Sequence, residues 1–193
     1  VTYLPGEAAM RPWPEPLQSP EWLVAVGAWL RQVHEATRDF EFRDDARFAW
    51  GPAEPSAAQV VNHGDLGPWN MLVDEGEFAG VIDWEFARFG PPVDGLAEAA
   101  FELGPLRENR EMLRGGVTEE RIRRRVDALC RGYGGVDSGD VIARVEPMLE
   151  ERLAEARRLA EAGRALFVAS VEAGAEEALE ADLAYFRERW TPT

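Results

Sequence analysis

The chain has 193 residues, of which 46% are hydrophobic and 30% are charged, and its formal net charge is −15 at pH 7. This balance is typical of a folded globular domain, and the strong negative charge disfavours nucleic acid and anionic membrane surfaces as partners. A single cysteine, Cys130, and the lack of any apolar run near the roughly 20 residues of a membrane span predict a cytoplasmic protein without disulfides.

Residues 1–18 predict a linker, because Pro5-Gly6 and further prolines at positions 12, 14 and 16 keep the backbone irregular. A helix of about five turns is expected next, with Ser19 as its N-cap and Pro20 in its first turn. Large apolar side chains then recur at helical spacing up to Val33. His34 follows this stripe, and we expect it to be a buried structural histidine.

A loop is predicted over residues 40–55, followed by a short strand at residues 59–62. The segments 71–73 and 79–82 predict a β-hairpin around the turn 74–77. Four helices are expected to complete the chain. They cover residues 92–103, residues 119–133 after a Thr118 cap, a segment that begins near Asp140, and a last one from about Ala175 to Trp190.

The stretch between the strand and the hairpin has the spacing of a phosphoryl-transfer site. His63-Gly64-Asp65 is followed by Asn70 five positions after the aspartate, and by Asp83 thirteen positions later at the end of the hairpin. Phosphoryl transfer needs one aspartate at the attacking hydroxyl, and an amide oxygen and a second carboxylate on Mg²⁺. The alternative roles are a turn for Asp65 and a cap for Asn70.

Other parts of a kinase have no counterpart in the sequence. No glycine-rich loop precedes His63, and all 21 cationic residues are arginines, so no lysine can pair with nucleotide phosphates. We therefore expect these residues to supply the acceptor half of a phosphotransfer site.

With these motifs the chain resembles the carboxy-terminal lobe of the aminoglycoside phosphotransferase family, the small-molecule kinases that share the choline-kinase and protein-kinase fold. The resemblance rests on residues 63–65, 68–70 and 82–85. It implies an α+β, mostly helical fold: a protein-kinase-like C-terminal lobe whose small β-hairpin carries the catalytic and metal motifs, with the N-terminal lobe absent. Residues 1–193 would be one domain, with 1–18 as a hinge or linker remnant and 19–193 as the helical lobe.

Site roles follow from the resemblance. Asp65 would be the catalytic base or would orient the hydroxyl, and His63 would brace the catalytic loop. Asn70 and Asp83 would be magnesium ligands, while the segment around Tyr3-Leu4 resembles the place where the nucleotide base docks.

The sequence departs from the family pattern in the helix after the metal strand. The family usually has Asp-Leu-Ala there, with an aspartate that supports the catalytic loop. This chain has Gly95-Leu96-Ala97, and Asp94 stands one position early.

The implied function is transfer of the γ-phosphoryl group of ATP or GTP, with Mg²⁺, to a hydroxyl of a small, aminoglycoside-like molecule. A separate N-terminal lobe could complete the enzyme, and the face left without that lobe could also form homo-oligomers. The alternatives are a non-catalytic kinase remnant that binds a ligand or partner, and a piece of a longer enzyme.

Overall fold

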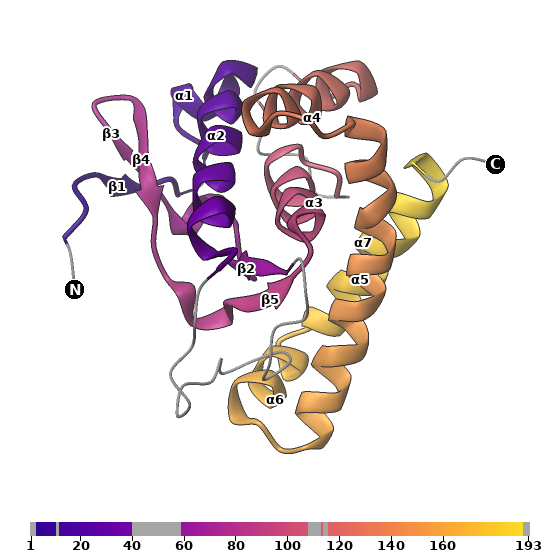
Figure 1. Ribbon diagram of the computed structural model, residues 1–193. Coiled ribbons are helices and arrows are strands. Elements are labelled where there is room, and N and C mark those ends of the chain that lie inside the picture. The colour runs from indigo at the N-terminus through magenta and orange to yellow at the C-terminus, as the bar shows by residue number, and fades with distance from the viewer. Residues whose placement is uncertain (1–2, 11, 40–58, 108–112, 114–115, 191–193) are drawn as a thin grey trace.

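The computed structural model describes residues 3–10, 12–39, 59–107, 113 and 116–190, so the loop expected at residues 40–55 lies outside the described residues. The described chain is mostly helical with two small antiparallel sheets (Figure 1). One sheet has the order β1-β3-β4, and the other pairs β2 with β5. No helix in the described ranges is long and apolar enough to span a membrane.

The linker expected at residues 1–18 contributes to the core instead. It contains strand β1 (Glu7–Ala8), which pairs with β3, and helix α1 (Glu15–Gln18), which begins after a proline. Trp13 and Leu17 are fully buried. The prolines fix an extended path and start the short helix, but they do not prevent the apolar side chains between them from packing.

Helix α2 (Pro20–Thr37) packs closely against α4 (Glu119–Tyr133). The caps are as predicted, since the Ser19 side chain accepts a hydrogen bond from the Glu21 amide and Thr118 accepts one from the Arg121 amide. Two glycines permit the close approach. A β-carbon on Gly27 would lie 2.1 Å from the Leu129 carbonyl oxygen, and one on Gly132 would lie equally close to Val24.

The predicted hairpin consists of β3 (Met71–Asp74) and β4 (Glu77–Val81), joined by Glu75 and Gly76 with positive φ angles. Two residues with positive φ form the tight turn that matches strand twist. Strand β2 (Val60–Asn62) pairs with β5 (Arg88–Gly90). Strand β5 was not predicted, because three residues are too few to show the alternation of apolar and polar side chains that marks a strand.

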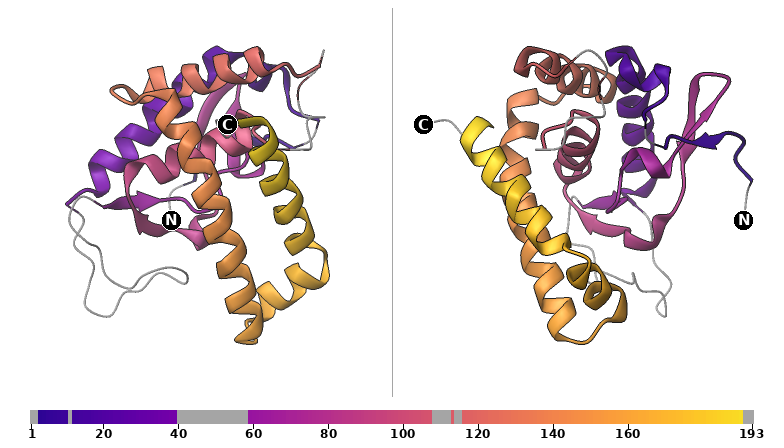
Figure 2. Two further views of the ribbon diagram at one scale, coloured as in Figure 1. Left: turned by 90° about the vertical axis from the view of Figure 1, so that its right-hand side faces the viewer. Right: turned by 180° about the vertical axis from the view of Figure 1, so that it is seen from behind.

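Helix α3 (Pro92–Leu103) lies at the centre of the fold, and every residue from Gly95 to its end is buried. Helix α5 (Ser138–Glu161) starts earlier than predicted, because Asp137 is its cap and accepts a hydrogen bond from the Gly139 amide. Helix α7 (Ala175–Trp190) runs beside α5, and α6 (Ala165–Glu172), which was not predicted, connects them at one end (Figure 2). Helices α5, α6 and α7 together are called the C-terminal arm.

His34, near the end of α2, is buried at 1% exposure, as the sequence predicts. Its Nδ1 lies 3.0 Å from the Tyr133 hydroxyl. Burial lowers the pKa of His34 from 6.5 to about 4, because the charged ring would lose its hydration.

We therefore expect stability to fall in mild acid. The folded-state pKa of His34 lies below the unfolded value, so its contribution is complete above pH 6.5 and is lost as the pH falls toward 4. Between pH 7 and pH 5 the free energy of unfolding should drop by about 2 kcal/mol from this group. Urea denaturation of wild type and His34→Gln checks this, and equal pH dependence in both proteins would contradict it.

Candidate active site

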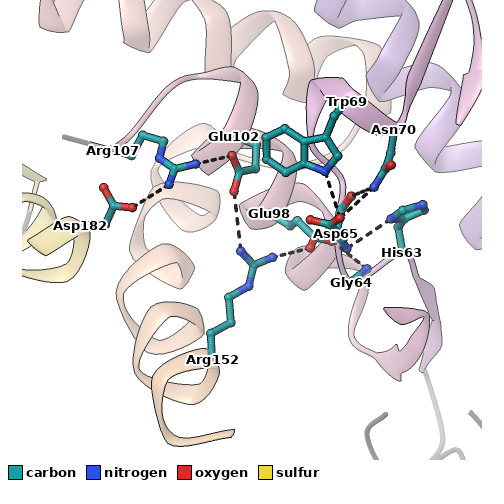
Figure 3. A network of polar contacts seen from close by, with 10 residues as sticks. All are labelled: His63, Gly64, Asp65, Trp69, Asn70, Glu98, Glu102, Arg107, Arg152 and Asp182. Atoms are coloured by element: carbon teal, nitrogen blue, oxygen red, sulfur yellow. Dashed lines mark hydrogen bonds and ion pairs between the residues drawn. The ribbon is translucent and has the colours of Figure 1, made fainter. Parts of the chain in front are cut away.

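Asp65 and Asn70 meet in the loop between β2 and β3 (Figure 3). One carboxylate oxygen of Asp65, Oδ2, accepts hydrogen bonds from the Trp69 indole at 3.0 Å and from the Asn70 amide nitrogen at 2.9 Å. The same amide nitrogen donates to the Asp65 carbonyl oxygen at 2.9 Å. These contacts fix one side of the carboxylate within its own loop, while Oδ1 has no protein partner within the described ranges.

The contacts of Asn70 also orient its oxygen. Because the amide nitrogen is committed to Asp65, the side-chain oxygen Oδ1 faces away from that residue. No protein group in the described part of the chain donates to it. An amide oxygen held this way is a suitable ligand for a hard cation such as Mg²⁺.

His63 connects the loop to the hairpin. Its Nδ1 accepts a hydrogen bond from the Asp65 amide at 3.2 Å, and its Nε2 donates to the Ile82 carbonyl oxygen at 2.9 Å. The buried ring also lies against Trp84, with 4.7 Å between ring centroids. Since Nδ1 accepts and Nε2 donates, the imidazole is the neutral Nε2–H tautomer, and both nitrogens are occupied by the backbone.

Asp83 lies two residues beyond the end of strand β4 and is exposed. Its backbone is left-handed, with φ 64° and ψ 67°, a conformation that an aspartate tolerates better than most residues. The preceding Ile82 amide donates to the Asn70 carbonyl oxygen at 2.9 Å. The backbone of Asp83 is thus fixed next to Asn70, and the hairpin brings the two expected metal ligands to one end of the sheet.

The loop has a support that sequence reasoning missed. The amide of Gly64 donates to Glu98 Oε2 at 3.1 Å, and the other oxygen of Glu98 pairs with Arg152. The expected support position, 95, is a glycine because a β-carbon there would lie 2.5 Å from Asn62 Oδ1. Asp94 is paired with Arg144 at 2.7 Å. Glu98 stands one helical turn after Asp94, which is the only sequence signal for its role.

Glu98 belongs to a network of buried charges that reaches the C-terminal arm (Figure 3). Arg152 from α5 lies 3.9 Å from Glu102, and Arg107 bridges Glu102 at 2.8 Å and Asp182 of α7 at 3.0 Å. Burial raises the pKa of Glu102, and the two arginines oppose that shift. The network joins the loop that carries Asp65 to α3, α5 and α7.

A pocket of about 300 Å³ opens beside Asp65. It lies between the loop, β5 and the α5–α6–α7 arm, so a molecule in it would reach the Asp65 carboxylate. Its lining residues are Gly64, Asp65, Phe86, Arg88, Arg152, Glu155, Ala156, Phe167, Ser170, Ala175 and Leu179.

Tyr3 and Leu4 lie on the surface, at 85% and 39% exposure. They precede β1, and the Leu4 side chain lies over Gly80 of β4, where a β-carbon would be 3.3 Å from Leu4 Cδ1. Leu4, in the segment expected to meet the nucleotide base, therefore lies against strand β4, which ends two residues before Asp83.

No group of three or more His, Cys, Asp and Glu side chains suited to a metal occurs in the part of the chain that the structure describes. A nucleotide-bound Mg²⁺ needs fewer protein ligands, since phosphates and water supply the rest of its octahedron. The Asp83 carboxylate and the side-chain oxygen of Asn70, which faces away from Asp65, fit this requirement in donor type.

Comparison with known proteins agrees with this geometry. Residues 41–136, which include the loop, the hairpin and α3, match a family described as the phosphotransferase enzyme family. This part of the chain is therefore similar to the phosphotransferase enzyme family.

Two individual proteins are similar to the chain. The trifolitoxin immunity protein of Rhizobium leguminosarum bv. trifolii is 30% identical over 126 residues, which are 64% of this chain and 46% of that protein. The chain thus spans less than half the length of this curated relative. The apoenzyme structure of macrolide 2'-phosphotransferase MphH from Brachybacterium faecium aligns with 98% of this chain and 70% of that one, at 17% identity and a TM-score of 0.46.

Proposed function

We propose that this protein transfers the γ-phosphoryl group of ATP, or of GTP, to a hydroxyl of a small molecule with the help of Mg²⁺. The observation that carries this proposal is the Asp65 carboxylate, which is held by Trp69 and Asn70 on one oxygen and borders a pocket. A carboxylate fixed in this way is already oriented before the substrate binds, so it can accept a hydrogen bond from the substrate hydroxyl without rearranging.

Asp65 orients the attacking hydroxyl and accepts its proton through the oxygen that the loop leaves free. His63 has no nitrogen available for proton transfer, and it acts by keeping the loop and Ile82 at a fixed separation. The catalytic contribution of His63 is therefore positional.

Asn70 Oδ1 and the Asp83 carboxylate would hold the magnesium ion. When bound with the nucleotide, the ion neutralises charge on the phosphate oxygens. Asp83 is exposed beyond the end of β4, so a nucleotide can approach it from solvent.

We propose that residues 1–193 act as one domain, the carboxy-terminal lobe of the enzyme. Ile82 and Trp84, on either side of Asp83 in the sequence, are exposed large apolar side chains, and so are Tyr3 and Leu4, of which Leu4 lies over Gly80 of β4. They suit the nucleotide base or a second lobe. Because the chain contains no lysine, a phosphate-binding lysine would come from a further segment or from a separate polypeptide. A cytoplasmic location belongs to the same proposal, and a second copy of the chain is another possible occupant of this face.

Removing the Asp83 carboxylate should weaken magnesium-dependent nucleotide binding. In calorimetric titration, wild type should bind ATP more tightly with Mg²⁺ than without it, and Asp83→Ala should weaken the Mg²⁺-dependent binding by at least about tenfold. Asp74→Ala removes an exposed carboxylate at the opposite end of the same hairpin and should behave like wild type. For weak binding, Mn²⁺ with ATP should broaden the amide NMR signals of Asn70 and Asp83.

The absence of any heat and of any broadening in wild type would contradict a nucleotide site and favour a ligand-binding remnant. Broadening that persists unchanged in Asp83→Ala would place the cation elsewhere. Asp65→Asn should retain nucleotide binding, because this residue is assigned to the acceptor hydroxyl.

A further inference from the structure

The pocket beside Asp65 has a lining that indicates what kind of acceptor it takes. We propose that the acceptor is an amphipathic, largely uncharged alcohol with an aromatic or branched apolar body, and that Phe167 of α6 is the residue that selects it. This inference rests on the proposed function, since it deepens the same site. It also revises the aminoglycoside-like acceptor expected from the sequence.

Much of the pocket lining is apolar. Phe86, whose backbone lies against Gly64, and Phe167 of α6 meet edge to face, with ring centroids 6.5 Å apart and planes at 83°. Ala156, Ala175 and Leu179 continue this lining on α5 and α7. Pairs of aromatic rings of this kind offer an apolar body both a face and an edge.

Helix α6 is rich in apolar residues, as buried helices are, but its side chains are not buried. Its sequence from Ala165 to Glu172 is almost entirely apolar, yet none of its residues is buried. Phe167 and Ser170 line the pocket, and the surface around Phe167 would leave water when an apolar ligand binds. Removing such surface from water is favourable in proportion to its area.

The charges of the pocket are balanced. Its two carboxylates are Asp65 and Glu155, and its two cations are Arg88 and Arg152. Arg152 is committed to Glu98 and Glu102, and Asp65 is committed to the reacting hydroxyl. A polycation would need several carboxylates around its ammonium groups, and this lining offers Glu155 alone.

The overall charge of −15 acts at a different stage. A long-range negative field raises the arrival rate of cations at the surface, but short-range contacts decide which molecule remains in the site. At the pocket those contacts are two phenyl rings and small aliphatic side chains.

Two probes distinguish the acceptor classes without nucleotide. These are 2-naphthaleneethanol, a neutral aromatic alcohol, and kanamycin, a polycationic aminoglycoside. We expect 2-naphthaleneethanol to shift the amide NMR signals of Gly64 and Ser170, and to bind at least tenfold more tightly than kanamycin. Phe167→Ser should weaken the alcohol about tenfold. The matched control is Leu166→Ser, which changes an exposed neighbour on the same helix that does not line the pocket.

Tighter binding of kanamycin with shifts at Gly64 would overturn the inference, and so would a failure of the alcohol to bind at this pocket. Equal weakening by the two serine variants would overturn the role of Phe167. Thermal melts of both variants exclude unfolding as a cause. The proposed function can fail separately from this inference. In that case 2-naphthaleneethanol would bind at the pocket, but the protein would show no Mg²⁺-dependent ATP binding.

Discussion

Arg125→Met should lower the free energy of unfolding by about 3–5 kcal/mol. Arg125 is 1% exposed, and its guanidinium donates to three backbone carbonyl oxygens: Leu103 at 2.9 Å, Gln18 at 3.1 Å and Leu17 at 2.9 Å. These carbonyls end α1 and α3, so one side chain on α4 satisfies two helix termini. Burial lowers the pKa of Arg125 to about 10, which leaves it charged at neutral pH.

The neighbouring Arg124 provides the control. It lies on the same helix and is largely exposed, with its nearest acidic partner, Glu120, at 3.8 Å. Arg124→Met should change the free energy of unfolding by less than about 0.5 kcal/mol. Chemical denaturation of the two variants measures both values. A cost below about 1 kcal/mol for Arg125→Met would show that water replaces the lost donors.

The second large effect is expected at the support of the catalytic loop. Glu98→Ala should cost about 3 kcal/mol, because it leaves Arg152 without its buried partner and the Gly64 amide without an acceptor. Hydrogen exchange at the Gly64 amide should become faster in the same variant. Denaturation and exchange followed by NMR check the two parts of this prediction.

A double-mutant cycle isolates the pair. Glu98→Ala combined with Arg152→Ala should be less destabilising than the sum of the single changes, by about 1 kcal/mol or more. Arg31 and Glu35 form an exposed pair at 2.7 Å on α2, and the same cycle there should give less than about 0.5 kcal/mol. Additive effects at Glu98 and Arg152 would mean that their contact contributes nothing to the folded state.

The parts of the fold that the sequence predicted are those with local signals. Helices α2 and α4 have caps and apolar stripes, and the hairpin has a two-residue turn. The strands β1 and β5 escaped prediction because they contain two and three residues, and their existence depends on partners far along the chain. Helix α6 escaped because six of its eight residues are apolar, and Ser170 and Glu172 alone are too few to define a polar face.

The same distinction holds within the site. The spacing of Asp65 and Asn70 is local, and the structure brings the two side chains into contact. Glu98 and Arg152 are 54 positions apart, and only the packing of α3 against α5 makes them a pair. A motif can thus locate two side chains that meet in the structure, while the residues that hold the loop in place depend on tertiary contacts.

The two ends of the C-terminal arm, formed by α5, α6 and α7, have different roles. Its base carries Arg152 and Asp182, which anchor the charge network behind the catalytic loop, whereas its tip carries α6, where no residue is buried. Substitutions at the tip therefore cost the fold little, although they alter the surface that a substrate meets. A lineage could change its choice of acceptor by mutating this tip while leaving the machinery at the base untouched.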